Sequence, residues 1–142
     1  MRILVIDDEP DVLLLCRVNL EYEGHEVLEA SSGEEGIRLA VVHRPDLIIL
    51  DVMLPEKDGF SVLRRLREHN EIVEVPVIFL TAKAQDDDQI RGFLAGAAEY
   101  VTKPFSPLAL NQAVSHIAAM SPAEREVRRT EQLARLSILG GH

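Results

Sequence analysis

The chain has 142 residues, 46% of them hydrophobic, and 24 acidic against 15 basic side chains give it a net charge of −9. This length suits one globular domain with a short appendage and is too short for two domains. No apolar stretch approaches the roughly 20 residues of a membrane helix, and the N-terminus lacks a signal-peptide pattern. We therefore expect a cytoplasmic protein without a membrane partner, with its single Cys16 in the core rather than in a disulfide or metal site.

Short apolar segments alternate with helical patterns through residue 120. The predicted strands are residues 2–7, 25–30, 46–51, 76–81 and 99–102, and the predicted helices are residues 10–23, 33–44, 58–69, 87–96 and 107–119. Three of the strands are continuous apolar runs, which is typical of a parallel sheet covered by helices on both faces. Five strand–helix units in this length indicate an α/β doubly wound domain over residues 1–120, followed by a tail over residues 121–142.

Reactive side chains stand at the ends of four predicted strands. The first strand ends in Asp7, Asp8 and Glu9, the third in Asp51, the fourth in Thr81, and the fifth in Lys103. Each residue alone has an ordinary explanation, such as a helix cap, a turn or a solvated lysine. Sheets of this class bind ligands at the carboxyl ends of their strands, so the four positions together indicate one site.

The residue types at these ends point to phosphoryl chemistry. Carboxylates from the first and third strands form an all-oxygen pocket, which favours Mg²⁺. A carboxylate that the metal does not need can attack phosphorus, while a lysine neutralises phosphoryl oxygens and a threonine hydroxyl hydrogen-bonds to one. Glu9 precedes Pro10, so we assign it to the start of the first helix rather than to the site.

Four ordered motifs carry a family resemblance over about residues 1–120. The segments "VIDDEP", "LIILDVMLPEKDGF", "VIFLTA" and "GAAEYVTKPF" together resemble the receiver domain of two-component response regulators. The resemblance implies a flavodoxin-like (βα)5 fold with strand order 2-1-3-4-5. It also implies that Asp51 is the phosphoacceptor and that Asp7, Asp8, Asp51 and the backbone carbonyl of Met53 bind Mg²⁺.

The same resemblance assigns roles to the last two strand ends. Thr81 matches the switch hydroxyl and Lys103 the phosphate-pairing lysine, with a cis peptide bond between Lys103 and Pro104. Tyr100 matches the switch aromatic, which rotates inward when the added charge draws the Thr81 hydroxyl toward it.

The same resemblance implies that two further positions tune how long the phosphorylated state lasts. They are Met53, two residues after the acceptor, and Lys83, two residues after the threonine. Met53 cannot orient an attacking water by hydrogen bonding, so our hypothesis is a long-lived phosphorylated state.

The implied function is a signalling switch rather than an enzyme acting on a metabolite. Such a domain accepts a phosphoryl group from a phosphohistidine of a sensor histidine kinase or phosphotransfer protein, or from a small phosphodonor, and loses it by hydrolysis. Its signal passes to an output domain or a downstream protein through the fourth helix, fifth strand and fifth helix, here residues 87–119. A homodimer formed on phosphorylation is one outcome that the sequence leaves open.

The C-terminal part departs from the DNA-binding branch of the family. The predicted fifth helix lacks the basic residues with which that branch forms dimers, and His116 is expected at the surface. Residues 121–142 hold four Arg and three Glu, so the negative charge lies in residues 1–120, which we do not expect to bind nucleic acid directly. The tail is a linker helix to an output domain, a dimerisation helix or a flexible end, with an expected i,i+4 pair of Glu124 and Arg128.

Three alternatives explain parts of the pattern. A phosphohydrolase of the haloacid-dehalogenase type also uses an aspartate nucleophile, but needs a second carboxylate where this chain has Met53. A flavodoxin-like cofactor carrier must cradle a phosphate in its first loop, where Asp7, Asp8 and Glu9 would repel it. A degenerate receiver is the third, although every key position is filled.

Overall fold

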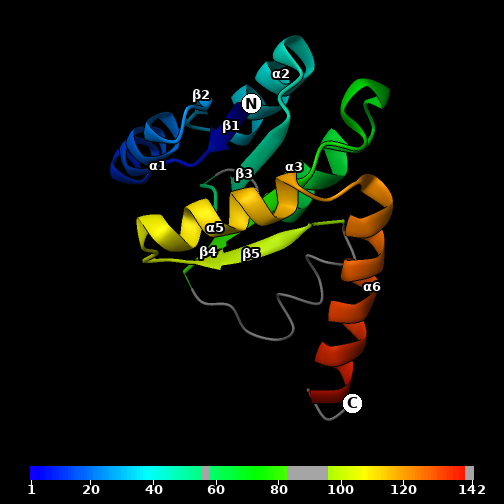
Figure 1. Ribbon diagram of the computed structural model, residues 1–142. Coiled ribbons are helices and arrows are strands. Elements are labelled where there is room, and N and C mark those ends of the chain that lie inside the picture. The colour runs from blue at the N-terminus through cyan, green and yellow to red at the C-terminus, as the bar shows by residue number, and fades with distance from the viewer. Residues whose placement is uncertain (56–57, 83–95, 140–142) are drawn as a thin grey trace.

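A parallel sheet of five strands in the order β2-β1-β3-β4-β5 forms the centre of the chain (Figure 1). The computed structural model describes residues 1–55, 58–82 and 96–139. The strands are β1 (Arg2–Ile6), β2 (Glu26–Ala30), β3 (Leu47–Asp51), β4 (Val77–Thr81) and β5 (Glu99–Thr102), and the helical elements are α1 (Pro10–Tyr22), α2 (Gly33–His43), α3 (Gly59–Leu66), η1 (Asn70–Ile72), α5 (Pro107–Ala118) and α6 (Pro122–Leu139).

The predicted α/β fold and its strand order are confirmed. Each predicted strand lies within one residue of an observed one at both ends, and the helices at 10–23, 33–44 and 107–119 are each found one residue shorter. The predicted helix 58–69 is shorter than expected, because α3 ends at Leu66 and a separate turn of 3-10 helix follows. The predicted helix 87–96 lies almost wholly outside the described residues.

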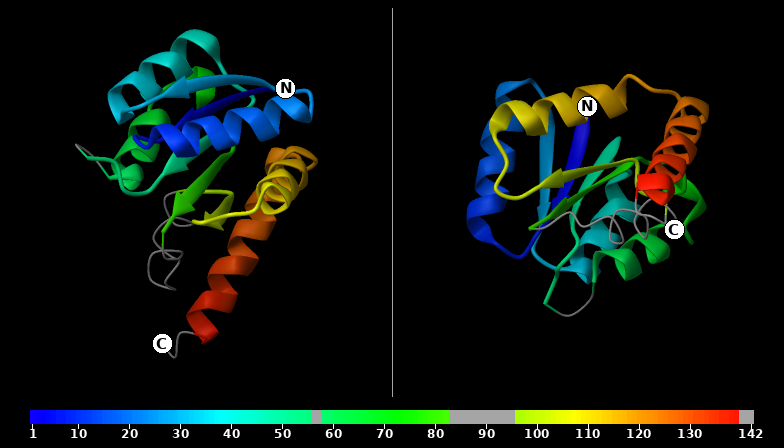
Figure 2. Two further views of the ribbon diagram at one scale, coloured as in Figure 1. Left: turned by 90° about the vertical axis from the view of Figure 1, so that its left-hand side faces the viewer. Right: turned by 90° about the horizontal axis from the view of Figure 1, so that it is seen from below.

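Two apolar clusters, one on each face of the sheet, hold the layers together. Figure 2 shows α1 and α5 on one face and α2 and α3 on the other. The two central strands β3 and β4 are buried at every position, which explains their continuous apolar sequence. Cys16 lies in the cluster under α1 and α5 and has no exposed surface, as predicted.

Local sequence signals set where several helices begin. The side chains of Ser32, Asp58 and Ser106 cap α2, α3 and α5 by accepting a hydrogen bond from a backbone N–H in the first turn. Pro10 opens α1 directly after Glu9, where its missing N–H costs nothing. These caps place the helix starts beside the carboxyl ends of the strands, where the reactive side chains lie.

The last helix, α6, leaves the end of α5 and runs past β5 toward the C-terminus (Figure 1). It starts with a reciprocal cap, in which Ser121 Oγ accepts from Glu124 N at 3.1 Å and Glu124 Oε1 accepts from Ser121 N at 3.0 Å. The predicted pairing of Glu124 with Arg128 is therefore wrong, because each side chain has a different partner. Arg128 instead pairs with Glu99 at the start of β5. Among the described residues, no helix is long and apolar enough to span a bilayer.

Candidate functional site

The carboxyl edge of the sheet gathers the side chains that the sequence singled out. Asp7 directly follows β1, Asp51 and Thr81 are the last residues of β3 and β4, and Lys103 directly follows β5. Because the strands are parallel and in register, these ends meet at one edge. Asp7, Asp51 and Thr81 have exposed fractions of 0%, 3% and 5%, so three polar groups are buried together.

Lys103 is the cation of this cluster. Its Nζ lies 2.8 Å from Asp7 Oδ2, 3.3 Å from Asp51 Oδ2 and 3.1 Å from Glu9 Oε1. Burial alone would lower the pKa of Lys103, but its contacts with Asp7 and Asp51 and with Glu9 outweigh burial and raise that pKa. The ammonium group therefore stays charged at any physiological pH.

Glu9 corrects one sequence-based assignment. It begins α1, as predicted, but makes no side-chain cap to that helix. Its carboxylate instead reaches Lys103, while its backbone N–H donates to Asp7 Oδ1 at 2.9 Å. No local pattern predicts this contact, because the two residues are 94 positions apart.

Asp51 is held with one oxygen toward its own loop and one toward Lys103. Its Oδ1 accepts a hydrogen bond from Met53 N at 3.0 Å, and its Oδ2 faces the ammonium group. Burial raises the pKa of Asp51 against the opposing effect of the Met53 hydrogen bond, and the negative charge of Asp7 raises it further. The fold thus holds the carboxylates of Asp7 and Asp51 close together although their negative charges repel each other.

The donor set fits a hard divalent cation. Asp7, Asp8 and Asp51 each offer one carboxylate oxygen, and these oxygens lie within 4.8 Å of one another. Asp7 Oδ2 is buried, and its close contact is the ion pair with Lys103. Oxygen ligands in this arrangement suit Mg²⁺, which keeps several waters when it binds to proteins.

The loop after Asp51 is packed tightly against the end of β3. Gly59 N donates to Val52 O at 2.7 Å, and Met53 pairs with Asp58 in an isolated bridge. A Cβ atom at Gly59 would lie 2.6 Å from the carbonyl oxygen of Asp51, so only glycine fits here without displacing the backbone. Met53 itself projects into solvent, with 73% of its surface exposed.

Thr81 and Lys103 are joined through the backbone at the ends of β4 and β5. Lys103 N donates to Thr81 O at 2.7 Å, and the Lys103–Pro104 peptide bond is cis. The Tyr100 ring is half-buried and packs on Phe79, with centroids 5.5 Å apart. His116 is exposed, as predicted, and Lys83 lies outside the described residues.

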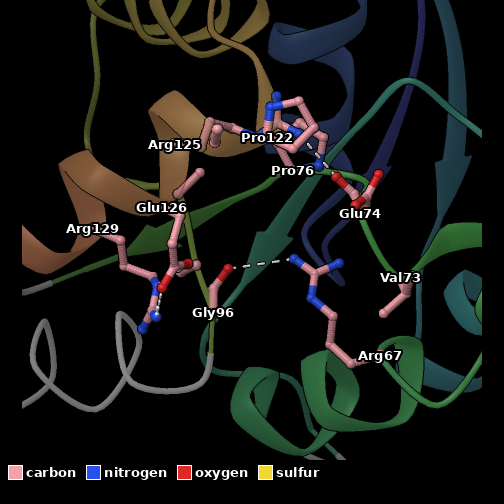
Figure 3. Close-up of a pocket in the computed structure, with 12 residues that line it drawn as sticks. Arg67, Val73, Glu74, Pro76, Gly96, Pro122, Arg125, Glu126 and Arg129 are labelled. Carbon is pink, nitrogen blue, oxygen red and sulfur yellow. Dashed lines mark hydrogen bonds and ion pairs between the residues drawn. The ribbon is translucent and has the colours of Figure 1, made fainter.

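A separate cavity of about 560 Å³ lies at the opposite edge of the sheet (Figure 3). It lies between α3, the residues before β4 and β5, and the start of α6. Arg67 borders it and donates to the carbonyl oxygens of Val75 and Gly96 at 2.8 and 3.3 Å. This cavity is distant from the acidic cluster, since Pro76 and Gly96 precede the strands whose far ends carry Thr81 and Lys103.

A five-stranded doubly wound sheet with an acidic cluster and a lysine at its carboxyl edge defines the receiver class of signalling domains. The family model described as response regulator receiver domain matches residues 3–115. The chain therefore belongs to the response regulator receiver-domain family, whose members are phosphorylatable aspartate switches in two-component systems.

Relatives of known name agree with this assignment. The chain is 44% identical over 120 residues to the alkaline phosphatase synthesis transcriptional regulatory protein PhoP of Bacillus subtilis. The matched region covers 84% of this chain and 49% of PhoP. It is 42% identical over 132 residues to the DNA-binding dual master transcriptional regulator RpaA of Synechocystis. This match covers 93% of the present chain and 51% of RpaA. The chain thus spans about half the length of the curated relatives it matches.

Solved structures show the same fold. The chemotaxis protein CheY4 of Vibrio cholerae superposes with a TM-score of 0.80 at 28% identity, over 82% of this chain and 97% of that one. The receiver domain of the sensor histidine kinase PA1611 from Pseudomonas aeruginosa superposes with a TM-score of 0.77 at 30% identity, over 84% and 98%. That structure has a magnesium ion coordinated in its active site cleft.

Proposed function

We propose that Asp51 accepts a phosphoryl group from the phosphohistidine of a sensor histidine kinase or a phosphotransfer protein. The observation that carries this proposal is the position of Asp51, whose Oδ2 faces Lys103 Nζ at 3.3 Å beside Asp7 and Asp8. A carboxylate oxygen of Asp51 forms the new bond to phosphorus, and the bond between phosphorus and the imidazole nitrogen of the donor breaks. Lys103 neutralises the phosphoryl oxygens, as phosphoryl transfer requires.

We propose further that this transfer depends on Mg²⁺, held by Asp7, Asp8, Asp51 and the backbone carbonyl of Met53. Bound there, Mg²⁺ supplies positive charge against the phosphoryl oxygens. The residues of the chain do the rest: Lys103 supplies a second positive charge, and the hydrogen bond from Met53 N orients the Asp51 carboxylate. In this proposal the domain catalyses only its own phosphorylation and dephosphorylation, because Met53 offers no proton to a leaving group at the position where a phosphohydrolase needs an acid.

The signal is proposed to leave through residues 87–119. Phosphorylation adds roughly 1.5–2 negative charges beside Thr81, which draws the Thr81 hydroxyl inward and lets Tyr100 change position. Tyr100 is half-buried against Phe79, so its movement alters the β5 surface. The relatives PhoP and RpaA are named transcriptional regulators, which favours a separate output domain acting on transcription rather than nucleic-acid binding by this acidic domain.

Phosphorylation by a small donor tests the proposal directly. We expect the chain to gain one phosphoryl group, seen by intact mass, when acetyl phosphate and Mg²⁺ are added together. The modification should fail in EDTA, since the clustered carboxylates would then repel the donor, and hydroxylamine should remove it as it does an acyl phosphate. Modification of equal extent with and without Mg²⁺ would show that the acidic cluster does not serve this reaction.

The exposed Met53 is expected to prolong the phosphorylated state. Its thioether cannot hydrogen-bond to an attacking water strongly enough to orient it. We expect Met53→Asn to shorten the phosphorylated lifetime several-fold, measured as phosphate release after the donor is removed. The substitution of Val42, which is similarly exposed, by asparagine serves as a control. If Met53→Asn decays at the wild-type rate, Met53 does not control hydrolysis.

A further inference from the structure

Two arginines on α6 tie this helix to the receiver domain. Arg128 donates to Ala98 O at 2.9 Å and to Glu99 Oε2 at 2.5 Å. Three residues earlier, Arg125 donates to Glu74 O at 3.0 Å. These contacts bind α6 to the backbone just before β4 and β5 and to the side chain of the first residue of β5. Both arginines lie beyond residue 115, where the match to the receiver family ends, so the match does not cover their contacts.

Arg128 makes the stronger of these contacts. Its two terminal nitrogens bind a carbonyl and a carboxylate at once, and the two side chains of the ion pair are only 20% and 21% exposed. Hydrogen bonds with an ionised donor or acceptor are about twice as strong as neutral hydrogen bonds. Partial burial of both side chains also protects the pair from screening by salt, whereas in the pair of Arg129 with Glu126 the glutamate is 61% exposed.

Glu99 connects this contact to the proposed switch residue. One of its oxygens pairs with Arg128, and the other accepts a hydrogen bond from the backbone N–H of Tyr100 at 3.0 Å. Tyr100 pairs with Phe79 in the sheet register and packs on the ring of that residue. One carboxylate therefore joins α6 to the strand on which the signal depends.

We propose that the surface formed by Glu74, Ala98 and Glu99 is a docking surface for α6 of the same chain, and that docking opposes phosphorylation of Asp51. This inference rests on the proposed function. Docked α6 restrains the start of β5 through Arg128 and Glu99, whereas the phosphorylated state requires Tyr100 on that strand to move. Because coupling between two sites is reciprocal, phosphorylation must then weaken docking by the same factor by which docking weakens phosphorylation.

The inference is tested by the affinity for beryllofluoride, a phosphoryl mimic, at a fixed Mg²⁺ concentration. We expect Arg128→Ala to raise the apparent affinity by at least about five-fold, the lower end of typical coupling between sites. Arg135→Ala is the matched control, because Arg135 is exposed on the same helix and makes no ion pair or hydrogen bond within the described part of the chain. Glu99→Gln removes the same ion pair from the other side, so it should act in the same direction.

Hydrogen exchange of the α6 amides gives a second readout that needs no ligand. Arg128→Ala should speed exchange in α6 without the mimic, and beryllofluoride should speed it in the wild-type chain. Equal affinities of the Arg128→Ala and Arg135→Ala chains would overturn the coupling, as would unchanged α6 exchange in Arg128→Ala. A wild-type chain that does not bind beryllofluoride at all would overturn the proposed function, and this inference with it.

Discussion

Replacing Asp51 by asparagine is expected to abolish phosphorylation by acetyl phosphate while leaving the fold intact. The amide oxygen can still accept the hydrogen bond from Met53 N, and Lys103 keeps its contacts with Asp7 and Glu9. The amide, however, is not a nucleophile toward phosphorus. Intact mass after incubation with acetyl phosphate and Mg²⁺ measures the effect, and a phosphoryl group on the variant would place the acceptor elsewhere.

The same substitution has a predicted effect on stability with a definite pH dependence. Burial raises the pKa of Asp51 above its ordinary value of 3.8, so the folded chain binds this proton more tightly than the unfolded chain does. The free energy of unfolding therefore falls as the pH rises from about 3.8 through the raised pKa, and the loss is complete above it. Asparagine does not ionise and avoids this loss.

Urea unfolding in EDTA measures this difference. We expect Asp51→Asn to be more stable than the wild-type chain at pH 7, with the difference shrinking as the pH falls toward 4. Asp11→Asn is the matched control, because Asp11 is an exposed carboxylate in the first turn of α1 outside the cluster. If the two chains differ in their free energy of unfolding by the same amount at both pH values, ionisation of Asp51 does not destabilise the folded chain.

Asp8→Asn is expected to weaken Mg²⁺ binding and to stabilise the metal-free chain at the same time. Asp8 contributes an oxygen to the acidic cluster, yet none of the Lys103 contacts goes to it. Like charges about 5 Å apart repel by roughly 0.8 to 3 kcal/mol, depending on their exposure to solvent. The negative charge of Asp8 is therefore not neutralised by an ion pair with Lys103 and is neutralised only when a cation binds.

Two measurements separate these effects. Calorimetric titration should show the Mg²⁺ affinity reduced by at least about tenfold. Loss of a residue that only hydrogen-bonds to a metal ligand already lowers metal affinity by about that factor. Urea unfolding in EDTA should show Asp8→Asn about 1 kcal/mol more stable than the wild type, with Asp11→Asn again as control. A variant that binds Mg²⁺ as tightly as the wild type would remove Asp8 from the metal site.

The fold was predictable because local pattern and tertiary structure agree in this chain. The runs "LIIL" and "VIFL" are apolar at every position since β3 and β4 are covered on both faces, and strand ends follow directly from where each run stops. The positions of Asp51, Thr81 and Lys103 at one edge then follow from parallel pairing alone. Among the elements that the structure describes, α3 differs most from the prediction, because its helical pattern continues past Leu66 whereas the helix ends there and a 3-10 helix begins at Asn70.

Long-range ion pairs were beyond the reach of the sequence. Glu9 was assigned to a helix start and Glu124 to a pair with Arg128, because local spacing was the only guide. In the structure Glu9 pairs with Lys103, and Arg128 pairs with Glu99. Both pairs join residues that are distant in the sequence and come close only in the folded chain. Charged side chains reach several ångströms from their backbone, so their partners depend on packing that periodicity does not encode.

Cys16 gives the protein a built-in reporter of its own opening. Its side chain has no exposed surface, and burial, aided by the negative charge of Asp7, raises the pKa of the thiol to about 12. A thiol in that state is almost never ionised and is out of reach of alkylating reagents. Because it is the single cysteine of the chain, a pulse of iodoacetamide labels only molecules whose α1–sheet interface has opened. The labelled fraction, read as one mass shift, then measures how often this half of the core opens in any state of the switch.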